Sequence, residues 1–152
     1  MNANLEVRIL LPSDREAILA FAQIQLRELV ADQMEREMQS WNARWRPEAL
    51  DYYLPQGWSF GAFLQGKMVA LALGQPLLFY RGLTQTLWVE ELLSSLPEAT
   101  NVLLDTLYKW AKDKHLQCVL LESRPDREHI IESWPKALLM AGPMIEIRTS
   151  RF

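Results

Sequence analysis

The sequence predicts an α/β protein of the α+β type, with one mixed, mostly antiparallel sheet and helices on both of its faces. Two turn sequences, Gln65-Gly66-Lys67 and Arg81-Gly82, join neighbouring strands as hairpins, which makes those strands antiparallel. A helical pattern over residues 96–114 then leads to a short apolar strand, and strands of that kind are typical of parallel pairing. The predicted order of elements is β-α-α-β-β-β-α-β-α-β.

The chain opens with a strand and a helix. The segment Glu6–Leu11 alternates and then becomes apolar, and Pro12 ends it. Directly afterwards, Ser13-Asp14-Arg15-Glu16 has the S-x-x-E pattern of a capping box, which predicts that a helix begins there. The apolar residues from Ile18 to Leu29 fall on one face of that helix.

A second helix is predicted from a stripe of large apolar residues. The positions follow helical spacing, and Arg46-Pro47 ends the pattern: Met34, Met38, Trp41 and Trp45. Two interpretations remain open at this point. The stripe is either part of the core or an apolar groove for a substrate or partner, because methionine adapts its shape and tryptophan offers a large contact area. A short helical turn over residues 48–54 follows.

The middle of the chain predicts three strands and the longest helix. The strands cover Trp58–Leu64, Met68–Tyr80 and Thr84–Leu93, and the third should lie inside the sheet. A second S-x-x-E box, Ser95-Leu96-Pro97-Glu98, predicts a helix that runs to about Lys114.

The last part of the chain predicts a strand, a helix pattern and a final strand. Gln117–Glu122 is the short apolar strand. The helical pattern over residues 128–141 contains Pro135, so Ser133 is expected to cap a fresh helix. A last strand is expected over Pro143–Arg148.

Composition excludes several classes of function. The 152 residues fit a single domain, residues 1–152, and the net charge is −3 without any run of Lys or Arg. Nucleic acid and anionic membranes are therefore not expected partners. The N-terminus lacks the pattern of a secretory leader, so a cytoplasmic location is expected. No metal site is expected, because His115 and His129 have no His or Cys at ligand spacing.

Three stretches resemble the GNAT superfamily of acyl-CoA-dependent N-acyltransferases. They are the opening strand and helix over residues 7–29, the hairpin Ala62–Ala72, and the strand Trp88–Leu93; Leu138–Gly142 is similar to a helix end of that family. The resemblance implies a GNAT-like domain that transfers an acetyl or other acyl group from acyl-CoA to an amine of a small molecule or protein.

The resemblance also implies where acyl-CoA would bind. In the family, the cofactor lies along the central strand, and its pyrophosphate sits on a glycine-bearing loop at the following helix start. The implied cofactor-binding residues are Leu92, Leu93 and Ser94 on the strand, with Thr100, Asn101 and Val102 at the helix. Residues 97–104 contain no glycine, and Glu98 places a negative charge there.

The implied catalytic residues are Glu90 and Glu91, where family members often place a glutamate as general base. Strand alternation predicts that the two point to opposite faces, so that at most one reaches the site. Glu122 is a weaker second candidate. The substrate-binding hypothesis names Met38, Trp41 and Trp45.

A different class of function stays open beside the enzyme. The glycine-free helix start, and the absence of any tyrosine after Tyr108 to act as general acid, favour a GNAT-shaped binding or regulatory protein without acyl-CoA chemistry. Few residues follow Gly142, so the sheet is expected to have an open edge that a second copy could cover as a homodimer.

Overall fold

The computed structural model describes residues 5–124, 127–134, 136–140, 145, 147 and 148. It divides the chain into two compact units, Met1–Glu122 and Ser123–Phe152. Among the described residues, the first unit contains the sheet and four α-helices, and the second contains one short helix. The organisation of residues 1–152 as a single domain stays a prediction.

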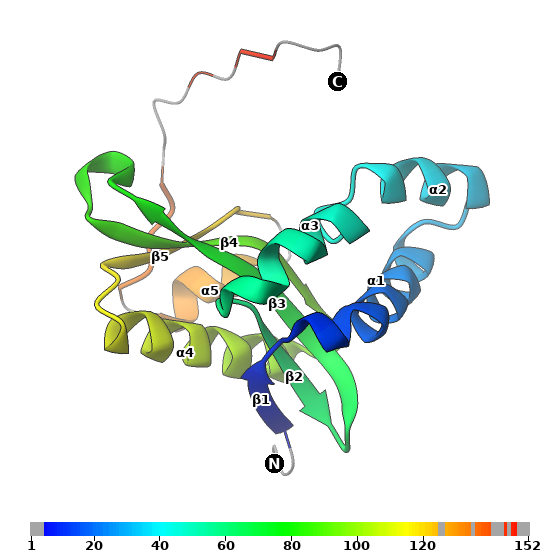
Figure 1. The fold of residues 1–152 in the computed structure, drawn as a ribbon, viewed down its shortest axis with the longest axis horizontal. Coiled ribbons are helices and arrows are strands. Elements are labelled where there is room, and N and C mark those ends of the chain that lie inside the picture. Colours follow the sequence, from blue (N-terminus) through cyan, green and yellow to red (C-terminus); the bar gives the residue numbers. More distant parts are fainter. Residues whose placement is uncertain (1–4, 125–126, 135, 141–144, 146, 149–152) are drawn as a thin grey trace. The chain divides into compact units, whose positions relative to one another are not determined.

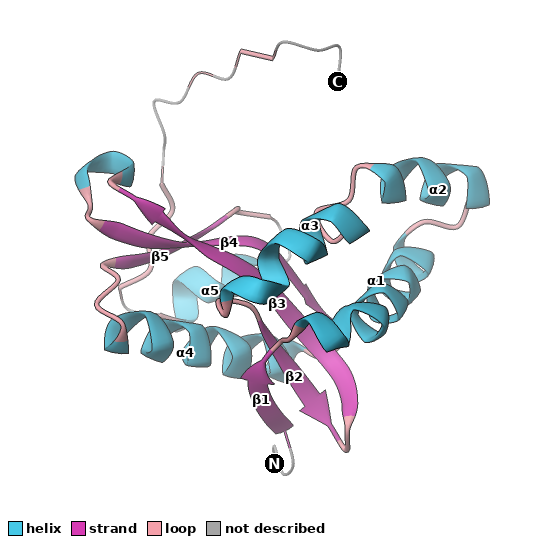
Figure 2. Ribbon diagram, viewed as in Figure 1, coloured by secondary structure: helices cyan, strands magenta, loops and turns pink. Residues whose placement is uncertain are grey.

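The first unit is built on a five-stranded mixed sheet, in agreement with the predicted fold class (Figure 2). The strands follow one another in chain order across the sheet, which leaves β4 inside it as expected. Neighbouring strands are antiparallel except for β4 and β5, which are parallel. The strands are β1 (Leu5–Ile9), β2 (Phe60–Leu64), β3 (Lys67–Leu78), β4 (Gln85–Ser94) and β5 (Cys118–Leu121).

Helices cover both faces of the sheet (Figure 1). The helices are α1 (Arg15–Leu29), α2 (Gln33–Trp41), α3 (Pro47–Tyr53), α4 (Pro97–Asp113) and, in the second unit, α5 (Glu128–Ser133). Leu71 and Leu73 of β3 pack into the core beneath α1 and α3. Side chains alternate along a strand, so Ala70 and Ala72 face the other side, which α4 covers.

Both predicted capping boxes are wrong in detail. Asp14, not Ser13, occupies the N-cap of α1, and its carboxylate accepts a hydrogen bond from the Leu11 amide at 2.7 Å. The same carboxylate pairs with Arg8, and this bond lowers the pKa of Asp14. At α4 the N-cap is Leu96, and no side chain caps the helix; Ser95 instead donates its hydroxyl to the Val69 carbonyl.

The methionine and tryptophan stripe does not form one helix face. Helix α2 ends at Trp41, and Trp45 is only 7% exposed because it packs into the core. Met34, Met38 and Trp41 are 70%, 56% and 70% exposed. The core interpretation is therefore correct for Trp45 and wrong for the three residues on α2.

The C-terminal predictions are tested only in part. Helix α5 ends at Ser133, and residues 136–140 are not helical, so the fresh helix expected after Ser133 is not found there. Pro135 itself and most of the strand expected over residues 143–148 lie outside the described residues.

Candidate active site

A bulge in β4 organises the candidate site. Leu73 of β3 pairs with Glu91, and the next residue of β3, Gly74, pairs with Val89. Glu90 therefore has no partner on β3 and is the extra residue of a β-bulge. Gly74 lies close to the backbone just before β2, because a Cβ there would stand 2.7 Å from the Trp58 carbonyl oxygen.

The bulge places both glutamates on the same face of the sheet. Residues that pair across antiparallel strands share a face, so Glu91 lies on the side of Leu73, beneath α1 and α3. Glu90 lies on that side too, because its carboxylate hydrogen-bonds Tyr53 of α3. The expectation that alternation separates Glu90 from Glu91 is therefore wrong, since the extra residue interrupts the alternation.

The Glu90 carboxylate contacts three different side chains. One oxygen accepts a hydrogen bond from the indole nitrogen of Trp88, and the other lies 3.7 Å from Nε of Arg44. The third contact is the Tyr53 hydroxyl. Burial, followed by the charge of Glu90, raises the pKa of Tyr53 to about 12, so this phenol stays protonated at neutral pH. The Glu90 side chain remains 26% exposed.

Arg44 contacts two carboxylates and one backbone carbonyl. It lies in the loop between α2 and α3, donates from Nη1 to the Glu90 carbonyl at 3.1 Å, and donates from Nη2 to the Glu122 carboxylate. The pKa of Arg44 is raised, first by the hydrogen bond to Glu122 and further by the charges of Glu122, Glu90 and Glu91, against the lowering effect of burial. Glu122, the weaker candidate from the sequence, thus joins the Glu90 cluster.

A chain of hydrogen bonds leads from Tyr53 to the surface. The Gln75 side-chain amide donates to the Tyr53 hydroxyl at 3.3 Å, and the exposed Tyr52 donates its hydroxyl to Gln75 at 2.8 Å. Arg44, Tyr53 and Gln75 were not predicted from the sequence. No local pattern could have identified them, because these bonds join residues that lie between 22 and 78 positions apart.

The distal half of β4, defined here as Glu90–Ser94, differs from the proximal half in its pairing. Within the described residues, pairing with β5 is confined to Thr86–Val89, whereas pairing with β3 continues to Ser94. This half contains the three strand residues implied to bind cofactor. Leu92 donates its amide to the Glu91 carboxylate at 2.9 Å, Leu93 is partly buried against the core, and the Ser94 hydroxyl contacts the Leu96 backbone.

The start of α4 offers little to a phosphate group. Pro97 has no amide hydrogen, and the amides of Ala99 and Thr100 both donate to the Leu96 carbonyl, at 3.1 and 3.3 Å. Glu98 is exposed in the first turn. Of the implied helix residues, Thr100 is buried, Val102 is half-buried and Asn101 is exposed. The start of α4 thus leaves few backbone amides for a phosphate group.

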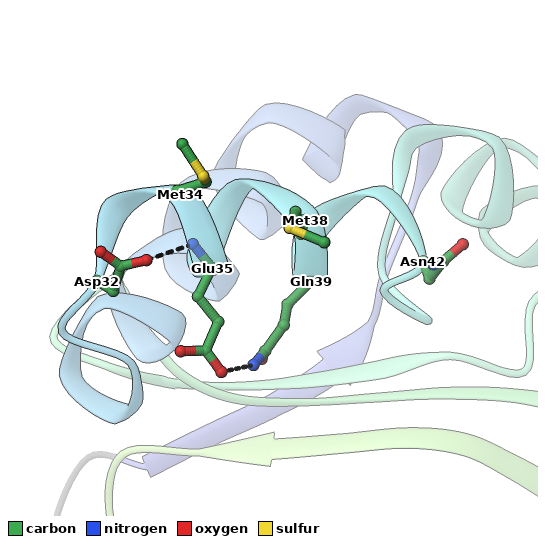
Figure 3. Close-up of a pocket in the computed structure, with 6 residues that line it drawn as sticks. All are labelled: Asp32, Met34, Glu35, Met38, Gln39 and Asn42. Carbon is green, nitrogen blue, oxygen red and sulfur yellow. Dashed lines mark hydrogen bonds between the residues drawn. The ribbon is translucent and has the colours of Figure 1, made fainter.

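The exposed residues of α2 border a hollow of about 550 Å³ on the outside of the helix (Figure 3). Its lining residues are Asp32, Met34, Glu35, Met38, Gln39 and Asn42. Glu35 is hydrogen-bonded to two of the other lining residues. Its amide donates to Asp32, and its carboxylate accepts from Gln39. Of the implied substrate-binding residues, Met38 lines this hollow, Trp41 is exposed nearby on the same helix, and Trp45 is buried in the core.

The described part of the chain has neither a candidate metal centre nor a candidate membrane-spanning helix. No group of three or more His, Cys, Asp or Glu residues there could hold a metal ion. No helix among the described residues combines the length and apolar character that crossing a membrane requires.

No protein-family model matches the sequence, and no curated protein matches it. Solved structures match over nearly the whole chain. Wild-type TTHA1254 from Thermus thermophilus is 21% identical, with a TM-score of 0.60 over 97% of this chain and 98% of its own. The ribosomal-protein-alanine N-acetyltransferase from Brucella melitensis biovar Abortus 2308 is 13% identical, with a TM-score of 0.63 over 96% and 99%.

The aminoglycoside N-acetyltransferase AAC(6')-Iy, solved in complex with CoA, is 11% identical and has a TM-score of 0.66, over 99% of this chain and 98% of its own. The sheet, its helices and these matches define a fold of the acetyltransferase class. In particular, the chain has the fold of the GNAT superfamily.

Proposed function

We propose that this protein is an N-acyltransferase that moves an acetyl or other acyl group from acyl-CoA to an amine of a small molecule or protein. One observation carries the proposal: the β4 bulge sets the Glu90 carboxylate among Arg44, Tyr53 and Trp88, directly after the last residue of β4 that pairs with β5. The GNAT fold supports it, since the matched structures include one in complex with CoA.

The cofactor would lie along the distal half of β4. When bound, acyl-CoA supplies the thioester acyl group. The backbone of Leu93 and Ser94 would hold the pantetheine arm, and Leu92 takes part less, because its amide already donates to Glu91. At the helix, Asn101 offers an exposed side-chain donor, whereas Thr100 is buried and Val102 is apolar.

Glu90 is the better placed of the two catalytic candidates. Its side chain is 26% exposed, whereas Glu91 is only 6% exposed and uses one carboxylate oxygen to accept from the Leu92 amide. Glu90 would take a proton from the ammonium group of the acceptor, so that the neutral amine attacks the acyl carbon. The C–N bond of the amide would form as the C–S bond of the thioester breaks, and CoA would leave as a thiolate that takes up the second proton of the amine nitrogen. On the acceptor side we propose Met38 and Trp41, which are exposed on α2; the buried Trp45 would instead anchor the loop that carries Arg44.

Two measurements test this function. Thermal unfolding should shift upwards with acetyl-CoA or a longer acyl-CoA, since ligand at 100 times its dissociation constant adds about 2.7 kcal/mol of stability. In an assay of thiol release with a panel of amines, Glu90→Gln should abolish turnover while the thermal shift remains. Full turnover in Glu90→Gln would remove Glu90 from the mechanism.

A second candidate function is favoured by the start of α4. Pro97 without an amide hydrogen, and Glu98 exposed in the first turn, support a GNAT-fold binding or regulatory protein that has no acyl-CoA chemistry. The absence of any thermal shift with millimolar acetyl-CoA, for both the native protein and Glu98→Gln, would favour this candidate. Under the enzyme proposal Glu98→Gln should instead tighten acyl-CoA binding about fivefold. The reason is that two like charges about 4 Å apart repel each other by about 1 kcal/mol in water.

The edge of the sheet at β5 could serve this second candidate function as a binding surface. β5 is the last strand of the sheet in the described part of the chain, and all four of its residues are half-buried. A homodimer that pairs along this strand is our proposal for covering it. Light scattering over a range of concentrations would test it, and a monomer at all concentrations would contradict it.

A further inference from the structure

We infer that Arg44 holds the ends of β4 and β5 together through its contacts with Glu90 and Glu122, an arrangement called the bracket below. Arg44 is thereby a positioning residue for Glu90. The inference deepens the proposed function and rests on it for the role of Glu90 in acyl transfer. The bracket itself is a statement about the fold, so it can be measured without cofactor or acceptor.

The paired part of β4 and β5 ends directly before two glutamates. The last pair of the parallel ladder is Val89 with Leu121, and the next residue on each strand is a glutamate, Glu90 and Glu122. Glu90 is also the bulge residue without a partner on β3. Its carbonyl thus belongs to neither ladder, and it accepts from Nη1 of Arg44 instead. Arg44 supplies the hydrogen bond that the sheet does not supply.

The geometry of the Arg44 guanidinium also links the two strand ends. Three groups on two strands surround it: the Glu90 carbonyl at 3.1 Å from Nη1, the Glu90 carboxylate at 3.7 Å from Nε, and the Glu122 carboxylate at Nη2. The donors of arginine form a rigid planar fork, so groups bound to different arms are fixed relative to one another. Arg44 therefore sets both the separation of the strand ends and the orientation of the Glu90 side chain.

The loop that holds Arg44 is itself anchored. The next residue, Trp45, is 7% exposed within the core, and Arg46 is the N-cap of α3 directly before Pro47. A guanidinium attached to a fixed backbone loses less freedom when it binds. The bracket is consequently tied to α3, which also contributes Tyr53 to Glu90.

Removal of Arg44 should loosen this arrangement. The Glu90 carbonyl would lose its donor, and the carboxylates of Glu90 and Glu122 would lose the cation that both contact. The two like charges then repel each other, and the strand ends separate. Arg46→Ala is a matched control, because Arg46 lies in the same loop but its side chain pairs with Glu48 and donates to the Ala43 carbonyl at 3.3 Å, and contacts neither Glu90 nor Glu122.

The first experiment is hydrogen exchange of the full chain without any cofactor. Arg44→Ala should speed exchange of the amides in residues 90–94 and 118–122 at least tenfold, while Arg46→Ala leaves them at the native rate. Glu122→Gln, a change at an exposed residue that keeps the fold, should speed exchange in the same segments to a smaller degree. Unchanged exchange in both Arg44→Ala and Glu122→Gln would overturn the bracket.

The second experiment separates positioning from structure by kinetics. Arg44→Ala should lower kcat about tenfold or more with a KM for acyl-CoA within about twofold of native, because misplacing a catalytic group costs turnover before binding. Added guanidinium should restore part of kcat in Arg44→Ala. The kcat of Arg44→Lys should be lower than that of the native protein, since one ammonium cannot reach all three groups. A native kcat in Arg44→Ala would overturn the positioning role.

The two experiments also separate this inference from the proposed function. Faster exchange in Arg44→Ala, together with no acyl-CoA binding by the native protein, would confirm the bracket and reject the acyltransferase. Acyl transfer by the native protein, together with native exchange and native kcat in Arg44→Ala, would confirm the acyltransferase and reject the bracket.

Discussion

Glu90 shows how far one inserted residue can change the chemistry that a strand presents. Without the bulge, Glu90 and Glu91 would face opposite sides of the sheet. With the bulge, the charges of both carboxylates help to raise the pKa of Arg44, and Glu90 also contacts Tyr53 and Trp88. A cluster of this kind needs satisfied hydrogen bonds, because each buried polar group without a partner costs stability.

Thr86 gives a direct test of that cost. It is 1% exposed in β4, and its hydroxyl has no hydrogen-bond partner among the described residues. Thr86→Val keeps the shape of the side chain and removes the buried hydroxyl, so it should raise the free energy of unfolding by about 1 kcal/mol in a denaturant titration.

Thr106 is the control for this change, because its hydroxyl donates to the Val102 carbonyl at 3.0 Å. Thr106→Val removes a bond that is made and should not stabilise the protein. A loss of stability in Thr86→Val as large as that in Thr106→Val would show that the Thr86 hydroxyl has a partner in solution.

Tyr53 gives a prediction in alkaline solution. Its pKa is raised from 10.0 to about 12, first by burial and then by Glu90. Below pH 10 the phenol is protonated in both the folded and the unfolded chain, and its contribution is complete. Between pH 10 and about 12 the unfolded chain loses the proton first, so the free energy of unfolding falls as the pH rises.

The measurement compares native protein with Tyr53→Phe by denaturant titration at pH 8 and at pH 11. The loss of stability between these two values should be smaller in Tyr53→Phe, and a phenolate signal titrating near pH 12 should vanish from its absorbance spectrum. An equal loss in both proteins would contradict the raised pKa.

Among the elements, the start of α4 is where sequence and structure differ most usefully. The S-x-x-E pattern predicts that Ser95 caps the helix, yet Leu96 is the N-cap and Ser94 contacts the Leu96 backbone through its hydroxyl. Ser94→Ala should therefore cost about 1 kcal/mol of stability, and Ser95→Ala, which loses only the bond to Val69, about 0.5 kcal/mol. Thermal unfolding of the two variants would check this, and the reverse ranking would restore Ser95 as the cap.

The two hairpins and the approximate extent of α4 were predictable because their signals are local. Gly66 and Gly82 adopt positive φ at the two predicted turns, a conformation that glycine adopts without strain. Helix α4 spans Pro97–Asp113, within a residue or two of the prediction. The exposure of α2 could not be predicted, since helical spacing shows which residues share a face but not whether a core lies against that face.

The candidate site was predictable only in its strand residues. Glu90 and Glu91 follow from their place in β4. The bulge depends on the register with β3, and the contacts of Arg44 and Tyr53 depend on how α3 packs on the sheet. Neither the register nor the packing leaves a pattern in the residues concerned.

For the whole molecule, stability should be greatest at the centre of the sheet. β3 has a strand on each side, and its residues Val69–Leu73 are buried, whereas α2 contains no buried residue. Native-state hydrogen exchange should therefore be slowest in residues 69–73 and fast throughout α2. Equal protection in α2 would show that another surface covers this helix in solution.

The bulge also means that the paired segments of the neighbouring strands β3 and β4 differ in length by one residue. Ala70–Leu78 of β3 supplies nine residues to the pairing, and Gln85–Ser94 of β4 supplies ten. Glu90 is the extra residue of the bulge, so β3 and β4 could pair along their whole length without it. In a complete survey of substitutions, position 90 should show the largest difference between the effects on folding and the effects on activity. The fold depends on the backbone atoms of residue 90, whereas the proposed chemistry depends on its carboxylate.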